Sequence, residues 1–366
     1  MPDSLAAGAA YARFAPNGTP DDMSLVVSPV GADTGLRIAL QDLRLGRYYA
    51  ARDLLEMTGR EWGLRTSRSN LLAAGAGEPG IFKLWLDQEP NSPDAAMMWA
   101  RVLTRAALKA HRSGMSEDVV GSAARLAAKA GWRASELLPE CPVPWVDKIL
   151  LAQLPYPAHM LDPRARHRRM PWDELPGGRD QGMPHLGPWP LLGEVDARHP
   201  GNRGGYHAMR QYFQRVRSTG AAMDFSCWMV LSEPSNPELW LLPVYALVDK
   251  FRTEYENDGG ATERFWQTGV VGHYAVQAYN EWFAQLPPAE YPWVSMADFS
   301  HLAHALVANG ETRMAADVLR AMGPYVTAQP WKDVNTILGR SKDWTDGFLT
   351  LRASTLRRWP LTTPTT

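Results

Sequence analysis

The chain has little cysteine, and this scarcity argues against two common ways of stabilising a fold. It has two cysteines in 366 residues, Cys141 and Cys227. They lie far apart in the sequence, and neither belongs to a Cys-x-x-Cys pair or stands at ligand spacing from a histidine. A disulfide framework and a structural zinc site both need such groupings. We therefore expect two buried thiols in a fold that is stabilised by its hydrophobic core.

The chain also lacks an excess of charge of either sign and a long apolar run. Lys plus Arg number 38 against 39 for Asp plus Glu, a formal net charge of -1. Such a chain has no general attraction for nucleic acid or for an anionic membrane surface. No stretch approaches the roughly 18 consecutive apolar residues of a membrane-spanning helix, and no basic segment precedes an apolar one at the N-terminus. These features predict a cytoplasmic protein that binds neither nucleic acid nor membranes.

The signature motifs of several large enzyme classes are missing as well. The sequence has no P-loop, no Gly-x-Ser-x-Gly, no His-Glu-x-x-His and no protein-kinase set. The segment from Gly75 to Gly80 does match Gly-x-Gly-x-x-Gly, but a dinucleotide site requires a strand before this motif and a helix after it. Here the motif follows a helical segment and contains Pro79. We expect a plain loop and predict no cofactor.

A repeated helix-turn-helix pattern is the most informative feature that is present. The segment LRIALQDLRLGRYYAARDLLEMTG, residues 36–59, returns as SHLAHALVANGETRMAADVLRAMG, residues 300–323. In each copy an apolar stripe at helical spacing is followed by glycine and by a second stripe, which predicts two packed helices. Self-similarity of this kind is typical of repeat proteins, in which each helix pair buries its apolar face on its neighbour.

Three short linkers, at residues 89–94, 199–202 and 233–238, share one form. In each, a helix ends against proline and a short polar residue stands where it can cap the next helix. The second and third linkers contain Pro-x-Asn. A bulky residue stands four places after each of their asparagines, Tyr206 in one case and Trp240 in the other. With the repeated pattern, these linkers resemble those of tetratricopeptide-type helical-repeat proteins.

The resemblance implies an all-α fold, an irregular right-handed α-solenoid of αα-hairpins that carries a Pro-rich loop insertion. Composition and periodicity divide the chain further. We expect a flexible N-terminal arm (1–33), an N-terminal helical-repeat lobe (34–155), a Pro-rich linker or lid (156–200), a C-terminal helical-repeat lobe (201–358) and a disordered tail (359–366).

The resemblance also implies a concave groove lined by the first helix of each pair. Carried onto this chain, and with one aromatic residue added from the Pro-rich segment, the groove positions are Arg101, Arg105, Trp189, His207, Gln211 and Arg215. Basic and amide groups suit a peptide, a protein or a small acidic ligand. An ordinary exposed helix face is an equally good interpretation of the same pattern.

A second hypothesis is an enzyme of small-molecule metabolism with an aromatic pocket, containing His and Glu, at residues 172–304. The catalytic candidates are His207, His273, His304, Glu254 and Glu281. The chain has 15 tryptophans, and aromatic walls with titratable groups are common in small-molecule sites. Asp298, His301 and His304 stand at successive i, i+3 steps and are weak candidates for metal ligands. His304 aligns with Leu40 of the first copy, however, which favours a packed core residue.

The two hypotheses make different structural predictions. A binding or scaffold protein should have an open groove without perturbed titratable groups. An enzyme should have an enclosed aromatic cavity with His207, His273 or His304 near a carboxylate such as Glu254 or Glu281. The sequence favours the scaffold, because its specific signals concern architecture and not chemistry.

Overall fold

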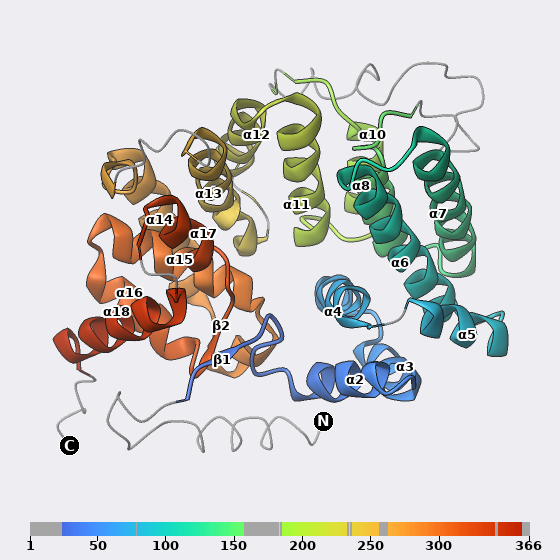
Figure 1. Ribbon diagram of the computed structural model, residues 1–366, viewed down its shortest axis with the longest axis horizontal. Helices are drawn as coiled ribbons and strands as arrows, with labels where there is room; N and C mark the ends of the chain where they lie inside the picture. Colours follow the sequence, from blue (N-terminus) through green and yellow to red (C-terminus); the bar gives the residue numbers. More distant parts are fainter. Residues whose placement is uncertain are drawn as a thin grey trace. The chain divides into compact units, whose positions relative to one another are not determined.

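The described part of the chain is mostly helical, in agreement with the all-α prediction. The computed structural model (Figure 1) describes residues 24–77, 79–156, 183, 185–232, 234, 236–255, 263–340 and 343–360. Its first elements are β1 (Val26–Val27), α2 (Thr34–Arg44), α3 (Tyr49–Thr58), α4 (Trp62–Gly75), α5 (Gly80–Gln88), α6 (Pro93–Arg112), α7 (Glu117–Leu137), α8 (Val143–Leu151), α10 (Trp189–Asp196) and α11 (Arg203–Tyr212).

The π-helical turn η4 (Phe213–Arg217) continues α11. The remaining elements are α12 (Thr219–Leu231), η5 (Pro237–Leu241), α13 (Leu242–Tyr255), η6 (Glu263–Phe265), α14 (Gly269–Glu281), η7 (Phe283–Gln285), η8 (Pro288–Trp293), α15 (Met296–Asn309), α16 (Thr312–Ala321), β2 (Tyr325–Val326), α17 (Trp331–Ile337) and α18 (Trp344–Arg358). Within the described residues, no helix combines the length and the apolar character that crossing a membrane requires.

The chain separates into two compact units. One unit is Thr34–Leu242, and the other combines Pro243–Thr366 with the segment up to Asp33. We call them the N-terminal unit and the C-terminal unit. Residues 201–242, which the sequence assigns to a C-terminal lobe, pack in the N-terminal unit. Most of the predicted linker or lid, 156–200, lies outside the described residues.

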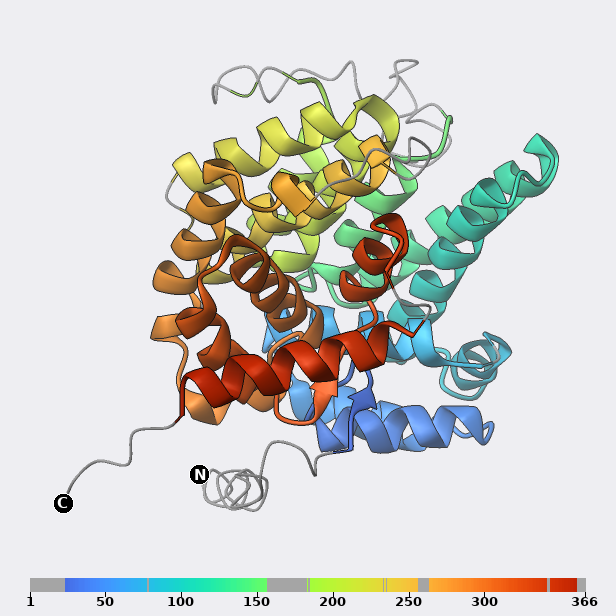
Figure 2. The same ribbon diagram turned by 60° about the vertical axis from the view of Figure 1, so that its left-hand side comes forward.

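Both ends of the described chain are attached to the C-terminal unit. β1 pairs in parallel with β2 (Figure 2). The Val26 amide donates to the Pro324 carbonyl at 2.8 Å. The sequence predicts no strand and a flexible arm over 1–33, of which 24–33 are described. Each of these strands has two residues, and the two strands lie about 300 positions apart in the sequence. A strand of two residues is too short to show the alternating pattern by which strands are recognised in a sequence. Of the predicted tail, Trp359 donates its indole N–H to the Thr312 hydroxyl at 3.0 Å, and 361–366 lie outside the described residues.

Both copies of the repeated segment form two packed helices, as the sequence predicts. α2 packs on α3 in the N-terminal unit, and α15 packs on α16 in the C-terminal unit. Gly46 and Gly310 follow the first helix of each pair with φ of 75° and 96°, a region in which glycine is not strained. The matched residues Ala39 and Ala303, Ala51 and Ala315, and Leu55 and Leu319 are all buried.

The polar residues of the three linkers cap the elements that follow them. The Ser92 side chain accepts from the Ala95 amide at 3.2 Å, and the Asn202 side chain accepts from the Gly205 amide at 3.2 Å. Asn236 likewise caps the next element, but this is the 3-10 turn η5 and not an α-helix. An α-helix from Pro237 would need an N–H at Pro243, which proline lacks.

The two Pro-x-Asn linkers are joined to each other and to α4. The Asn236 side-chain amide donates to the Gly201 carbonyl at 2.9 Å, and that of Asn202 donates to the Thr66 hydroxyl at 3.2 Å. A Cβ at Gly204 would lie 2.5 Å from a Thr66 methyl carbon. Glycine therefore allows the start of α11 to approach α4 closely.

We predict that Asn202→Ala destabilises the protein more than Ser92→Ala does. The first substitution removes a helix cap together with a buried hydrogen bond to α4, at a cost of about 2 kcal/mol. The second removes a cap alone, at a cost of about 1 kcal/mol. Denaturant unfolding of both variants would measure the difference. Equal losses would mean that the bond to Thr66 contributes nothing to stability.

Candidate functional site

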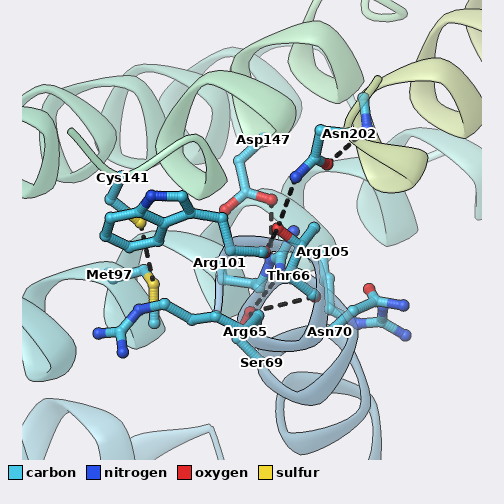
Figure 3. A network of polar contacts seen from close by, with 12 residues as sticks. Arg65, Thr66, Ser69, Asn70, Met97, Arg101, Arg105, Cys141, Asp147 and Asn202 are labelled. Carbon is cyan, nitrogen blue, oxygen red and sulfur yellow. Dashed lines mark hydrogen bonds and ion pairs between the residues drawn. The ribbon is translucent and has the colours of Figure 1, made fainter. Parts of the chain in front are cut away.

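Two predicted groove residues of α6, Arg101 and Arg105, lie in a polar network inside the N-terminal unit (Figure 3). The Arg101 Nε donates to Asp147 of α8 at 3.0 Å, and both side chains are 3% exposed. The same guanidinium donates to the Ser69 hydroxyl at 2.5 Å and to the Thr66 carbonyl at 3.0 Å, both on α4. Arg101 thus connects three helices.

A buried cation, Arg65, and a half-buried one, Arg105, lie near this ion pair. Arg65 of α4 is paired with Asp94 of α6 and donates to the Leu55 carbonyl at 2.9 Å. Arg105 donates to the Asn70 side chain at 3.3 Å. Burial lowers the pKa of the Arg105 guanidinium, and the Arg101 charge lowers it further. Several guanidinium groups thus lie close together in the N-terminal unit. The carboxylates of Asp94 and Asp147 are needed to neutralise their charge.

Asp147 is the carboxylate at the centre of the network. Burial raises the pKa of its carboxyl group, and the neighbouring Arg101 acts in the opposite direction. Its second oxygen, Oδ2, is buried without a hydrogen-bond partner in the described part of the chain. A buried ion pair recovers its desolvation cost only through good geometry, so the loss of either partner leaves an uncompensated charge. We conclude that this network holds α4, α6 and α8 together.

The other predicted groove residues lie elsewhere in the N-terminal unit. Trp189 is buried against Phe213 and Phe225, with ring centroids 5.8 and 5.9 Å away. His207 is also buried, and Gln211 is half-buried on the same helix, α11. Arg215 is exposed on η4. With Arg101 in the interior too, the six residues belong to the core, to its edge and to the surface, rather than to one open face.

The three metal candidates of α15 each have partners of their own. Asp298 accepts a hydrogen bond from the Tyr245 hydroxyl at 2.6 Å. The His301 Nδ1 donates to the Ala297 carbonyl at 2.7 Å, and its ring stacks on Tyr245 with centroids 3.8 Å apart. His304 lies between two indole rings. Within the described ranges, no three His, Cys, Asp or Glu side chains are grouped so that they could hold a metal ion.

Three of the remaining catalytic candidates are on the surface. His273 and Glu281 are exposed on α14. Glu254 is exposed on α13, where its carboxylate lies 3.7 Å from the Lys250 ammonium. None of the three lines the cavity described next. Of the five candidates, His304 is the one that does.

The C-terminal unit contains a cavity of about 510 Å³ that is walled mainly by aromatic and aliphatic side chains. Three helices each turn one stripe of side chains toward it, at the i, i+3, i+4 spacing of a single helix face. The stripes are His304, Val307 and Ala308 of α15; Trp331, Val334, Asn335 and Leu338 of α17 and its end; and Trp344, Gly347, Phe348 and Leu351 of α18.

Aromatic rings enclose His304 at one wall of this cavity. Its imidazole meets the Trp266 ring at 4.6 Å and the Trp331 ring at 5.0 Å, in both cases edge to face. Trp331 in turn meets Phe348 of α18 at 4.9 Å. The nitrogen atoms Trp266 Nε1, Trp331 Nε1 and His304 Nδ1 are buried without hydrogen-bond partners in the described part of the chain. The rings are thus held by packing alone.

The first copy of the repeat shows how a leucine packs at the corresponding helix position. Leu40 of α2 corresponds to His304, and both are buried. A Cβ on Gly75 of α4 would lie 2.6 Å from Leu40, so the leucine fills its space closely. In the second copy a titratable ring occupies the same position on the helix and borders an open volume.

His304 is neutral in the folded protein. Burial lowers the pKa of its imidazole from 6.5 to about 3, and the charges of His301 and Arg340 act in the same direction. Glu263 and Arg340, which also line the cavity, are paired with each other, with side chains 62% and 46% exposed. The charged groups therefore lie at the mouth of the cavity, whereas its interior wall is uncharged.

The pocket region predicted from the sequence overlaps the lining of this cavity only in part. The predicted pocket region, 172–304, contains Trp266 and His304 but ends before α17 and α18, which supply much of the wall. The missed signal was the regular spacing of residues 331–338 and 344–351. Each stripe by itself is also what an ordinary core helix shows.

We predict that breaking the buried ion pair is costly, whereas replacing both partners is not. Arg101→Met should lower the free energy of unfolding by about 3–5 kcal/mol, because it leaves Asp147 buried and unpaired. The double variant Arg101→Met, Asp147→Leu should regain most of that loss. The exposed pair Arg60 and Glu140, 2.7 Å apart, provides the control, since Arg60→Met should cost less than about 1 kcal/mol. A double variant as unstable as the single one would contradict this interpretation.

We predict that His304 makes the protein sensitive to acid. The unfolded chain takes up a proton below about pH 6.5, but the folded protein resists protonation of His304 down to about pH 3. The free energy of unfolding should therefore fall as the pH drops through this range, by roughly 1.4 kcal/mol per pH unit. His304→Leu should remove that part of the decline, as measured by urea unfolding from about pH 7.5 to about pH 4.5. The exposed His273→Leu is the matched control, and an unchanged decline in His304→Leu would contradict the prediction.

No model of a known protein family matches the chain, and no curated protein sequence matches it significantly. Among the described residues, the cavity of the C-terminal unit is the feature that bears most directly on function.

Proposed function

We propose that this protein binds a small, flat and largely apolar molecule in the aromatic cavity of its C-terminal unit. One observation carries the proposal, a cavity of about 510 Å³ lined by Trp266, Trp331, Trp344 and Phe348. Ligand pockets in proteins range from about 300 to 1,000 Å³ and are lined mostly by apolar and aromatic side chains. A flat ring placed there would bury its faces against indole and phenyl rings.

Binding is better supported than catalysis at this site. A general acid or base works best when its pKa lies near the operating pH, whereas the pKa of His304 is lowered to about 3. The carboxylate that lines the cavity, Glu263, is already paired with Arg340. An enzyme with His304 as base would need a carboxylate or another group that raises this pKa. Glu254 and Glu281 lie on helices outside the lining.

The relation to tetratricopeptide-type proteins also stays a proposal. The paired hairpins α2–α3 and α15–α16 and the bonded Pro-x-Asn linkers support it. A peptide or protein groove over Arg101, Trp189 and His207 is less well supported, because these three side chains are buried.

Equilibrium dialysis with 2-methylnaphthalene tests the binding proposal. We expect saturable, one-to-one binding to the full chain. Ala308→Trp places an indole in the cavity and should weaken binding by about tenfold or more, since it occupies the volume that the probe needs. Ala284→Trp adds the same indole at an exposed position of η7 and should leave the affinity unchanged.

Two results would count against the proposed function. One is the absence of saturable binding by a folded protein, judged from its circular dichroism. The other is equal binding by Ala308→Trp and the unaltered chain, which would place the probe elsewhere.

A further inference from the structure

Asn335 is the polar side chain on the cavity-facing stripe of α17. It stands four residues after Trp331 and three before Leu338, and all three line the cavity. Residues at this spacing share one helix face. An amide among indole, valine and leucine side chains is therefore placed beside any ligand that occupies the cavity.

The Asn335 carboxamide forms no hydrogen bond with another described residue, although its backbone carbonyl accepts from the Arg340 amide at 2.9 Å. Its side chain is half-buried. A Cβ at Gly347 of α18 would lie 3.3 Å from the Asn335 Nδ2, so the missing side chain at Gly347 leaves room for the amide. Both its donor and its acceptor remain available.

The cavity offers a charged ligand little compensation among its described lining residues. Glu263 and Arg340 neutralise each other at the mouth. His304 carries no charge at neutral pH, because burial keeps its pKa low. Moving a charge from water into such a site is unfavourable unless a partner and hydrogen bonds await it.

We infer that the ligand of this cavity is an uncharged planar ring system carrying one hydroxyl or carbonyl group, and that Asn335 recognises this group. The inference rests on the proposed function and adds to it the chemical class of the ligand and the residue that selects it. A single hydrogen bond to a half-buried amide corresponds to a preference of about fivefold to tenfold over an analogue that lacks the polar group.

Three probes that share one ring system test this inference by equilibrium dialysis against the full chain. They are 2-naphthol, 2-methylnaphthalene and 2-naphthoate, which carry a hydroxyl group, a methyl group of similar size and a negative charge. We expect 2-naphthol to bind about fivefold to tenfold more tightly than 2-methylnaphthalene, and 2-naphthoate to bind most weakly. Asn335→Leu and Asn335→Ala should abolish the preference for 2-naphthol while still binding 2-methylnaphthalene, which also shows that these variants are folded.

Asn280→Leu is the matched control, because Asn280 is an exposed asparagine of α14 that does not line the cavity. It should keep the preference for 2-naphthol. The inference is overturned if the preference survives in both Asn335 variants, if Asn280→Leu removes it, or if 2-naphthoate binds most tightly. Failure of all three probes to bind would overturn the proposed function itself, so the two failures are distinguishable.

Discussion

The packing of the N-terminal unit depends on the neutralisation of a guanidinium group in its interior. Arg101 lies on α6, and the groups that satisfy it come from α4 and α8. A cation without these partners would be very costly to bury. The three helices are therefore held in one relative position by polar geometry as well as by apolar contact, which is less tolerant of sliding than apolar packing alone. The aromatic core around Trp189 and Phe225 then fills the space between α10, η4 and α12.

The features that the sequence predicted are those that depend on neighbouring residues. The hairpins follow from apolar stripes and from glycines at Gly46 and Gly310, where a left-handed residue ends the first helix. The caps at Ser92 and Asn202 follow from a polar residue just before a helix. Each of these signals lies within a few positions of the structure that it determines, so no knowledge of distant residues was needed.

The features that the sequence did not predict depend on which helix faces meet. Arg101 and Arg105 were expected on an open groove, because spacing along α6 identifies a face but not what covers that face. Asp147, 46 positions further on, determines that Arg101 is buried. The cavity is a similar case, since Trp266, His304 and Phe348 come from separate segments. The alignment of His304 with Leu40 identified an interior position, and the neighbouring indoles, which the alignment does not reveal, determine its low pKa.

The hydrogen bond from Asn236 to the Gly201 carbonyl has a consequence for how the length of this chain can vary. It fixes the two ends of the segment between the linkers, so that α11, η4 and α12 must span a set distance. An inserted residue that kept the regular helical geometry would rotate every later side chain of that helix relative to the core, and this would disrupt the packing. Added residues would be absorbed as a local loop or as a widened helical turn, and η4 already has the wider π-helical geometry at the end of α11. Related chains of different length should therefore differ at that turn or outside the two linkers.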